Sequence, residues 1–212
     1  PHNFSPFATS MYMVLFGLPG GILGSLAFAK MSDKLAKKSI KNRVYIITGT
    51  LVGLFLFFVL MFLVPLPELT PEQGNFLGFL LSLPVTWLIG VLVVIGRALM
   101  GVYNINQPPI LQEINLPEAQ GLISSSNQFL ESIGYGIGTT IAGSLLLAFN
   151  YNFVKTVSIT MVIGIVGALL WLLSVRWIEN DVRYVSSILE ERSQEIRERR
   201  DQIPEEIKIT SV

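Results

Sequence analysis

Residues 96–143 read GRALMGVYNINQPPILQEINLPEAQGLISSSNQFLESIGYGIGTTIAG, and this stretch decides the fold. Apolar sequence long enough to cross a bilayer flanks it, yet the stretch itself carries an arginine, a glutamate and several amide side chains. Ionisable groups at membrane depth are costly and rarely face lipid, so they indicate a functional interior. The pattern predicts a helical hairpin: one helix ending near Ile114, a turn over 115–118, and a second helix from about Gln120.

Each helix of this predicted hairpin carries polar and small residues at helical spacing. Residues three, four or seven positions apart lie on one face of a helix. On the first helix these are Arg97, Gly101, Asn104 and Pro108, and on the second they are Ser124, Asn127, Glu131, Gly134 and Gly138. Two polar stripes on adjacent helices predict one shared cavity.

The composition excludes several kinds of site. The chain has no cysteine, which excludes disulfides and thiolate metal sites. His2 is its only histidine, which excludes a multi-histidine metal site and a histidine-based triad built from this chain alone. Ser124–Ser126 have no nearby base, and no glycine-rich phosphate loop follows a strand. We therefore expect no enzyme, no catalytic residue, no metal and no cofactor.

Positive charge is clustered rather than spread. Of the 15 lysines and arginines, six lie in residues 30–43 and seven in residues 176–208. Such blocks beside apolar spans are a membrane-topology signal and not a nucleic-acid footprint. We expect a multi-pass integral protein of the plasma membrane, with the lipid bilayer as partner, no nucleic-acid partner, and the basic loop and carboxyl tail in the cytoplasm.

The predicted fold class is an all-α membrane protein, a polytopic transmembrane helix bundle. Residues 1–178 form the bundle and 179–212 a cytoplasmic helical tail. The five expected spans are 6–29, 44–64, a third that begins between 76 and 85 and ends near 114, 121–149, and 154–178.

Prolines and glycines modify this outline. The third span is too long for one straight crossing, so Pro84 and the pair Pro108–Pro109 are expected to bend or break it. Small residues in the first span indicate either a close packing face or a flexing point; these are Gly17, Gly20, Gly21 and Gly24. In the tail, 181–202 predicts a solvated helix or an amphipathic helix on the membrane surface.

Two loops resemble signatures of the major facilitator superfamily. Asp33-Lys34-Leu35-Ala36-Lys37-Lys38 resembles the acidic–basic loop that follows an even-numbered helix there, with Ala36 in place of the usual glycine. Leu116-Pro117-Glu118-Ala119-Gln120-Gly121 looks like the cytoplasmic turn between helices ten and eleven, and a polar, then glycine-rich helix follows it. Ala29 replaces a further glycine of the first signature.

The resemblance covers residues 6–178 and implies that the five spans are helices eight to twelve of twelve. Helix seven and the whole amino-terminal half would be missing, and that half becomes an expected partner. Such transporters bind solute at the midplane between two halves and work by rocking-type alternating access. The implied function is secondary active transport of a small organic solute. Symport or antiport, and a proton or a sodium ion for coupling, are left open.

The resemblance also implies a gate latch at the cytoplasmic loop, made by Asp33, Lys34, Lys37 and Lys38. The alternative is that these residues only set topology. The translocation path is expected to include Arg97, Asn104, Gln107, Asn127, Glu131 and Tyr135. For the amides, the alternative is ordinary interhelical hydrogen bonding.

Arg97 and Glu131 are the charged residues nearest the expected midplane. One reading is a buried ion pair that fixes the bundle. The other is that Arg97 binds an anionic substrate or that Glu131 carries a proton. Gly134, Gly136 and Gly138 are expected to pack against a neighbour.

A second function stays open beside transport: a non-transporting membrane sensor or scaffold with a transporter-like fold. The interior discriminates between the two functions. A transporter needs the polar stripes open to water, whereas a sensor could fill the same space with apolar side chains and act through its tail.

Overall fold

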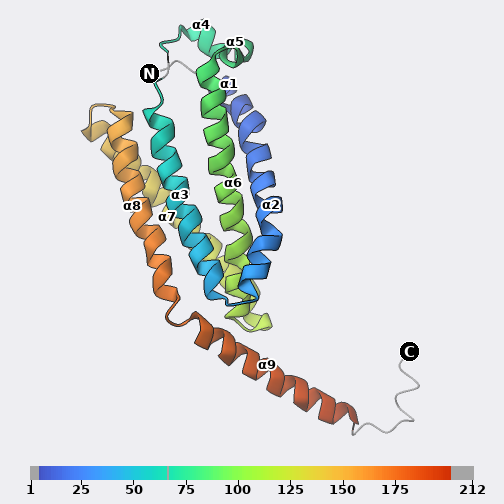
Figure 1. Ribbon diagram of the computed structural model, residues 1–212. Coiled ribbons are helices and arrows are strands. Elements are labelled where there is room, and N and C mark those ends of the chain that lie inside the picture. Colours follow the sequence, from blue (N-terminus) through green and yellow to red (C-terminus); the bar gives the residue numbers. More distant parts are fainter. Residues whose placement is uncertain (1–4, 66, 202–212) are drawn as a thin grey trace.

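The computed structural model describes residues 5–65 and 67–201, and every secondary-structure element among them is a helix (Figure 1). Four helical segments are long and apolar enough to cross a membrane: Pro6–Ala36, Lys41–Leu63, Pro84–Glu113 and Phe153–Ser174. The chain is therefore an all-α membrane protein. Helix α7, Pro117–Ala148, is long but is not one of the four. Its serines, amides and Glu131 lower its hydropathy, so a fifth crossing stays a prediction.

The first segment consists of α1 (Pro6–Tyr12), a π-helical turn η1 (Met13–Gly17) and α2 (Leu18–Ala36). In the π turn the N–H of Leu18 donates to the carbonyl of Met13, five residues back. Pro19 has no N–H to donate, which favours such a local irregularity. Helix α2 runs seven residues past the predicted end at residue 29, so the first residues of the predicted basic loop are helical.

Helix α3 spans Lys41–Leu63 and is followed by two short helices, α4 (Pro71–Asn75) and α5 (Leu77–Ser82). Helix α6 then runs over Pro84–Glu113. The expected break at Pro84 is confirmed, because Leu83 is extended and Pro84 opens α6. The pair Pro108–Pro109 does not break α6, although it removes two backbone donors inside the helix.

Helix α6 is central to the bundle, because it packs along both α2 and α3, and α3 packs against α8 (Phe153–Ser174). Glycines make the α2–α6 contact close. A Cβ on Gly20 would lie 2.5 Å from the carbonyl oxygen of Val94, and one on Gly24 would lie closer still to that of Ala98. The same holds on α6, where a Cβ on Gly101 would lie 2.5 Å from the carbonyl oxygen of Gly21 in α2. The predicted packing face in the first span is confirmed.

Helix α7 behaves differently from the rest of the bundle. None of its residues is buried, and it crosses behind α3 and α8 at a steep tilt in Figure 1. A Cβ on Gly134, Gly136 or Gly138 would meet nothing within 4 Å in the described chain. The expectation that these glycines pack against a neighbour is therefore wrong for this chain, because α7 leans away from the helices that could have covered them.

The tail forms α9, Ile178–Asp201, and both apolar and polar contacts hold it to the bundle. Buried Ile178 packs in one apolar cluster with residues of α3 and α6. Glu179 accepts a hydrogen bond from Ser39 at 2.9 Å and pairs with Lys41 at 2.8 Å. Arg192 pairs with Glu118 at 2.7 Å. The α2–α3 loop, the α6–α7 turn and the start of the tail thus lie together at one end of the molecule, hereafter the basic end. The predicted tail helix is confirmed to Asp201, and residue 202 lies outside the described residues.

The carboxylates that hold α9 are stabilised in their charged form. Hydrogen bonds from Lys41 and Ser39 lower the pKa of Glu179 below its usual 4.5. Glu118 has a lowered pKa because its own backbone N–H and then Arg192 donate to the carboxylate. The Arg192–Glu118 pair is exposed and the Lys41–Glu179 pair is about one-third exposed, so salt screens both, the first more strongly.

We expect Gly24→Ala to loosen the α2–α6 contact, because its new methyl group would overlap the Ala98 backbone. Overpacking of this kind costs about 1–3 kcal/mol. The matched control is Gly49→Ala, where an added Cβ meets nothing within 4 Å. Thermal unfolding in detergent should show a lower midpoint for Gly24→Ala only. Equal midpoints for the two variants would contradict the close approach.

We expect acid to loosen the outer part of α9 from the bundle, while the apolar contact at Ile178 remains. Groups with a lowered folded pKa contribute stability above their unfolded pKa, here about 4.5, and lose it as pH falls through the folded value. A spin-label distance between cysteines placed at Lys37 and Gln194 should be narrow at neutral pH and broad in acid. At neutral pH the double variant Glu118→Gln/Glu179→Gln should also broaden it, whereas Glu190→Gln, on the same helix, should not. A narrow distribution in the double variant would show that other contacts hold α9.

Candidate functional site

Polar side chains from α6 and α7 meet in one cluster, formed by Tyr103, Gln107, Asn127 and Glu131. Glu131 Oε1 accepts hydrogen bonds from Gln107 Nε2 at 2.5 Å, Asn127 Nδ2 at 3.0 Å and the Tyr103 hydroxyl at 3.4 Å. Gln107 also donates to Asn127 Oδ1 at 3.4 Å. Three of the predicted path residues, Gln107, Asn127 and Glu131, are thus brought together. We call this group the Glu131 cluster.

The donors to Glu131 are all uncharged. Gln107 is buried, whereas Glu131 is exposed. A carboxylate that accepts three neutral hydrogen bonds on one oxygen is positioned but not neutralised by a cation.

The structure does not contain the proposed ion pair between Arg97 and Glu131: within the described residues no salt bridge reaches Arg97. Each residue lies near the middle of its own helix, as predicted. However, the tilt of α7 brings Glu131 beside Gln107, ten residues beyond Arg97, which is about 15 Å along α6. The hairpin register therefore separates the two charges.

The two predicted stripes also do not face each other. Gly101 of the α6 stripe contacts α2, and Arg97 and Asn104 line a hollow between α2 and α6 with a volume of about 600 Å³. Residues of the α7 stripe instead meet Tyr103 and Gln107, on the far side of α6. The two stripes therefore do not line one cavity together: the α7 stripe joins a polar cluster on one side of α6, and a hollow lies on the α2 side.

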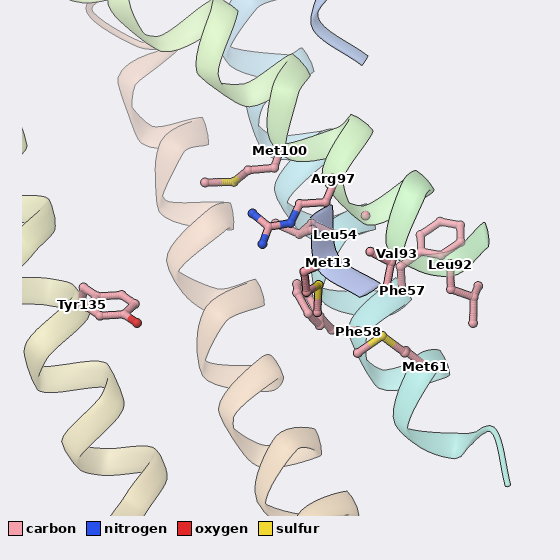
Figure 2. A pocket seen from close by; sticks show the side chains of 11 residues that line it. Met13, Leu54, Phe57, Phe58, Met61, Leu92, Val93, Arg97, Met100 and Tyr135 are labelled. Carbon is pink, nitrogen blue, oxygen red and sulfur yellow. The ribbon is translucent and has the colours of Figure 1, made fainter. Parts of the chain in front are cut away.

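Arg97 borders a second cavity of about 490 Å³, hereafter the Arg97 cavity. Figure 2 shows its guanidinium reaching from α6 toward the side on which Tyr135 of α7 lies. Apolar side chains from α3, α6 and η1 form most of the remaining wall: Met13, Leu54, Phe57, Phe58, Met61, Leu92, Val93 and Met100, with Gly96. Of the predicted path residues, Arg97 and Tyr135 thus share this cavity, whereas Asn104 lies in the other hollow.

At the basic end a buried arginine joins three helices. Arg43 of α3 is only 7% exposed, and it pairs with Asp33 of α2 at 2.9 Å. It donates to Asn106 Oδ1 of α6 at 3.4 Å and lies 3.9 Å from Glu113 of the same helix. Asn106 also accepts from the Ser32 hydroxyl. We call these residues the Arg43 network.

The four predicted latch residues do not lie together in one network. Asp33 is in the Arg43 network, whereas Lys34, Lys37 and Lys38 are exposed and take part in no salt bridge in the part of the chain that the structure describes. Sequence reasoning missed Arg43, and it placed Asn106 among the amides that could line the cavity rather than in this network. The signal was present, because Arg43 lies one turn before buried Ile47 and Asn106 lies one turn from Val102 and Ile110, all on buried faces.

Comparisons with known proteins identify no relative: no family model, no curated protein and no solved structure matches the chain. The structure itself shows the class of the protein: an all-α membrane protein with four apolar helices of membrane-spanning length. The likeness to the major facilitator superfamily remains a resemblance in two loops. Any function must therefore be argued from the Glu131 cluster, the Arg97 cavity and the Arg43 network.

We expect Arg43→Ala to be destabilising. It would leave buried Asn106 without one donor, and a buried polar group that loses a hydrogen-bond partner costs about 1–3 kcal/mol. The Asp33 and Glu113 carboxylates also lose their cation, but both are exposed and stay hydrated. Lys38→Ala removes an exposed charge nearby and should change stability by less than about 0.5 kcal/mol. Thermal unfolding of both variants in detergent measures the difference. A similar midpoint for both would show that Arg43 has no structural role.

Proposed function

We propose that this chain is most of the carboxyl-terminal half of a secondary active transporter with a major-facilitator-like fold. Its long helices would be helices eight to twelve, with α7 as the fifth crossing. The transported molecule would be a small organic solute, moved by alternating access between two halves. The observation that carries the proposal is the Glu131 cluster: a carboxylate in the middle of a hairpin helix, held by three neutral donors and paired with no cation of the described chain.

The open face of α7 supports a second half. A helix with no buried residue and with three glycines open to space would be poorly stabilised on its own. Glycine faces allow close helix contact in membranes. The missing amino-terminal half would cover this face and supply the second wall of the solute path.

The Arg43 network supports a gate at the basic end, which we assign to the cytoplasmic side of the plasma membrane. It ties α2, α3 and α6 together by contacts that involve three charged side chains. Such a network has to loosen if these helices part when the solute path opens on that side. Asp33 would hold the latch through Arg43, and the three exposed lysines of the loop would set topology.

A proton-carrying Glu131 gives a direct test in the full-length protein reconstituted into vesicles. We expect Glu131→Gln to fold normally, because an amide oxygen still accepts from Gln107 and Asn127. It should remove the pH dependence of solute uptake, since the amide cannot titrate. Uptake of labelled organic acids, amino acids, sugars and amines at several pH values measures this, beside thermal unfolding.

The matched control is Glu72→Gln, an exposed carboxylate of α4 that should keep the wild-type pH profile. A wild-type profile in Glu131→Gln would exclude the proton role. Failure of the full-length protein to take up any solute of the panel would reject transport and favour the sensor or scaffold. In that case the polar contacts of α9 would be the feature to pursue.

A further inference from the structure

We propose that the Arg97 cavity binds an organic anion with an apolar body, such as an arylalkyl carboxylate. The guanidinium would hold the carboxylate, and the side chains from α3, α6 and η1 would surround the body. This inference deepens the proposed function by naming a substrate class, and it rests on that function only for the step of transport, not for binding.

The first observation is that Arg97 is a cation without a protein partner. Among residues 5–65 and 67–201 its side chain takes part in no hydrogen bond or salt bridge, and it borders the cavities on either side. It follows Pro84 by 13 residues and precedes Glu113 by 16, so it lies about 20 Å from either end of α6. A charge at this depth is costly unless an anion or water meets it.

The second observation is that the Arg97 side chain is positioned. Its stem lies against Gly17 of η1, where an added Cβ would be in ordinary van der Waals contact with Nε at 3.4 Å. Val93, one turn earlier on α6, lies against the same place. A planar guanidinium held by its stem presents paired N–H donors, the geometry that matches a carboxylate.

The third observation is the character of the wall. Apart from Arg97 and the Tyr135 hydroxyl, the side chains that line the cavity carry no oxygen or nitrogen. Phe57, Phe58 and three methionines supply aromatic and polarisable surface, which suits an aryl or alkyl group. A sugar would leave its hydroxyl groups unpaired there, and an amine would face a like charge.

Glu131 does not compete for Arg97, because its hydrogen bonds are to Tyr103, Gln107 and Asn127. The cation is thereby left for a ligand. The hollow on the α2 side shares Arg97 but adds Ser25 and Asn104 and no aromatic ring. The apolar body is therefore assigned to the side of Phe57 and Phe58.

The test is equilibrium binding to the purified full-length protein in a non-ionic detergent, with three probes. These are 4-phenylbutyrate, its neutral amide 4-phenylbutanamide, and acetate, which has the charge without the body. We expect 4-phenylbutyrate to bind roughly tenfold or more tightly than the amide, the effect of one charge-assisted contact, and acetate not to bind. Equal affinity for acid and amide, or no binding of the acid, would overturn the proposal.

Variants separate the charge from the wall. Arg97→Gln should reduce the affinity for 4-phenylbutyrate to that of the amide, whereas Lys155→Gln, an exposed cation elsewhere, should change neither. Phe57→Ala should weaken acid and amide alike. If Arg97→Gln does not fold, Arg97→Lys keeps the charge and should bind the acid more weakly while still preferring it to the amide. Unchanged acid binding in whichever Arg97 variant folds would reject the site.

Uptake in vesicles distinguishes this inference from the proposed function. Binding of 4-phenylbutyrate that depends on Arg97, without uptake of any solute, would uphold the site and reject transport. Uptake of another solute that is unchanged by Arg97→Gln, without binding of the acid, would uphold transport and reject the organic-anion site.

Discussion

The close approach of α2 and α6 is the constraint on which the other features depend. Gly20 and Gly24 of α2 let the backbone of α6 come into direct contact, at Val94 and Ala98. On α6, Gly101 likewise lets the α2 backbone approach at Gly21. This fixes the rotation of α6 about its axis. Since each residue turns a helix by about 100°, Tyr103 and Gln107 must then point away from α2, toward α7. The Glu131 cluster therefore exists because glycines occupy the opposite face.

Helix content, the hairpin and the glycine contact could be predicted from the sequence, because each depends on local periodicity. Membrane-spanning length, the break at Pro84 and the small-residue face in the first span are all properties of short windows. The meeting of Gln107 with Asn127 and Glu131 was predicted as a set of path residues. It was not predicted as a cluster, because Gln107 lies off the stripe that helical spacing draws through Arg97 and Asn104.

The tilt and register of one helix relative to another could not be predicted from the sequence. The midplane positions of Arg97 and Glu131 were judged on each helix alone, which assumes that α6 and α7 run parallel to one another. Helix α7 is tilted instead, and its glycines have no neighbour to fix them, so no window of sequence encodes the register. The buried Arg43 was missed for the opposite reason. As one of a block of basic residues, Arg43 indicated membrane topology, although its position one turn before Ile47 places it on a buried face.

Paired and unpaired charges lie in different parts of this chain. At the basic end several charges are paired: Arg43 with Asp33 and Glu113, Lys41 with Glu179, and Arg192 with Glu118. In the middle of the hairpin, Arg97 and Glu131 could have done the same, and the fold keeps them apart. An unpaired charge at that depth costs stability, whereas a pair would be more stable and inert. A bundle that leaves both charges unpaired leaves them free to meet other groups, and for this reason we propose the function for the middle of the hairpin rather than for the basic end.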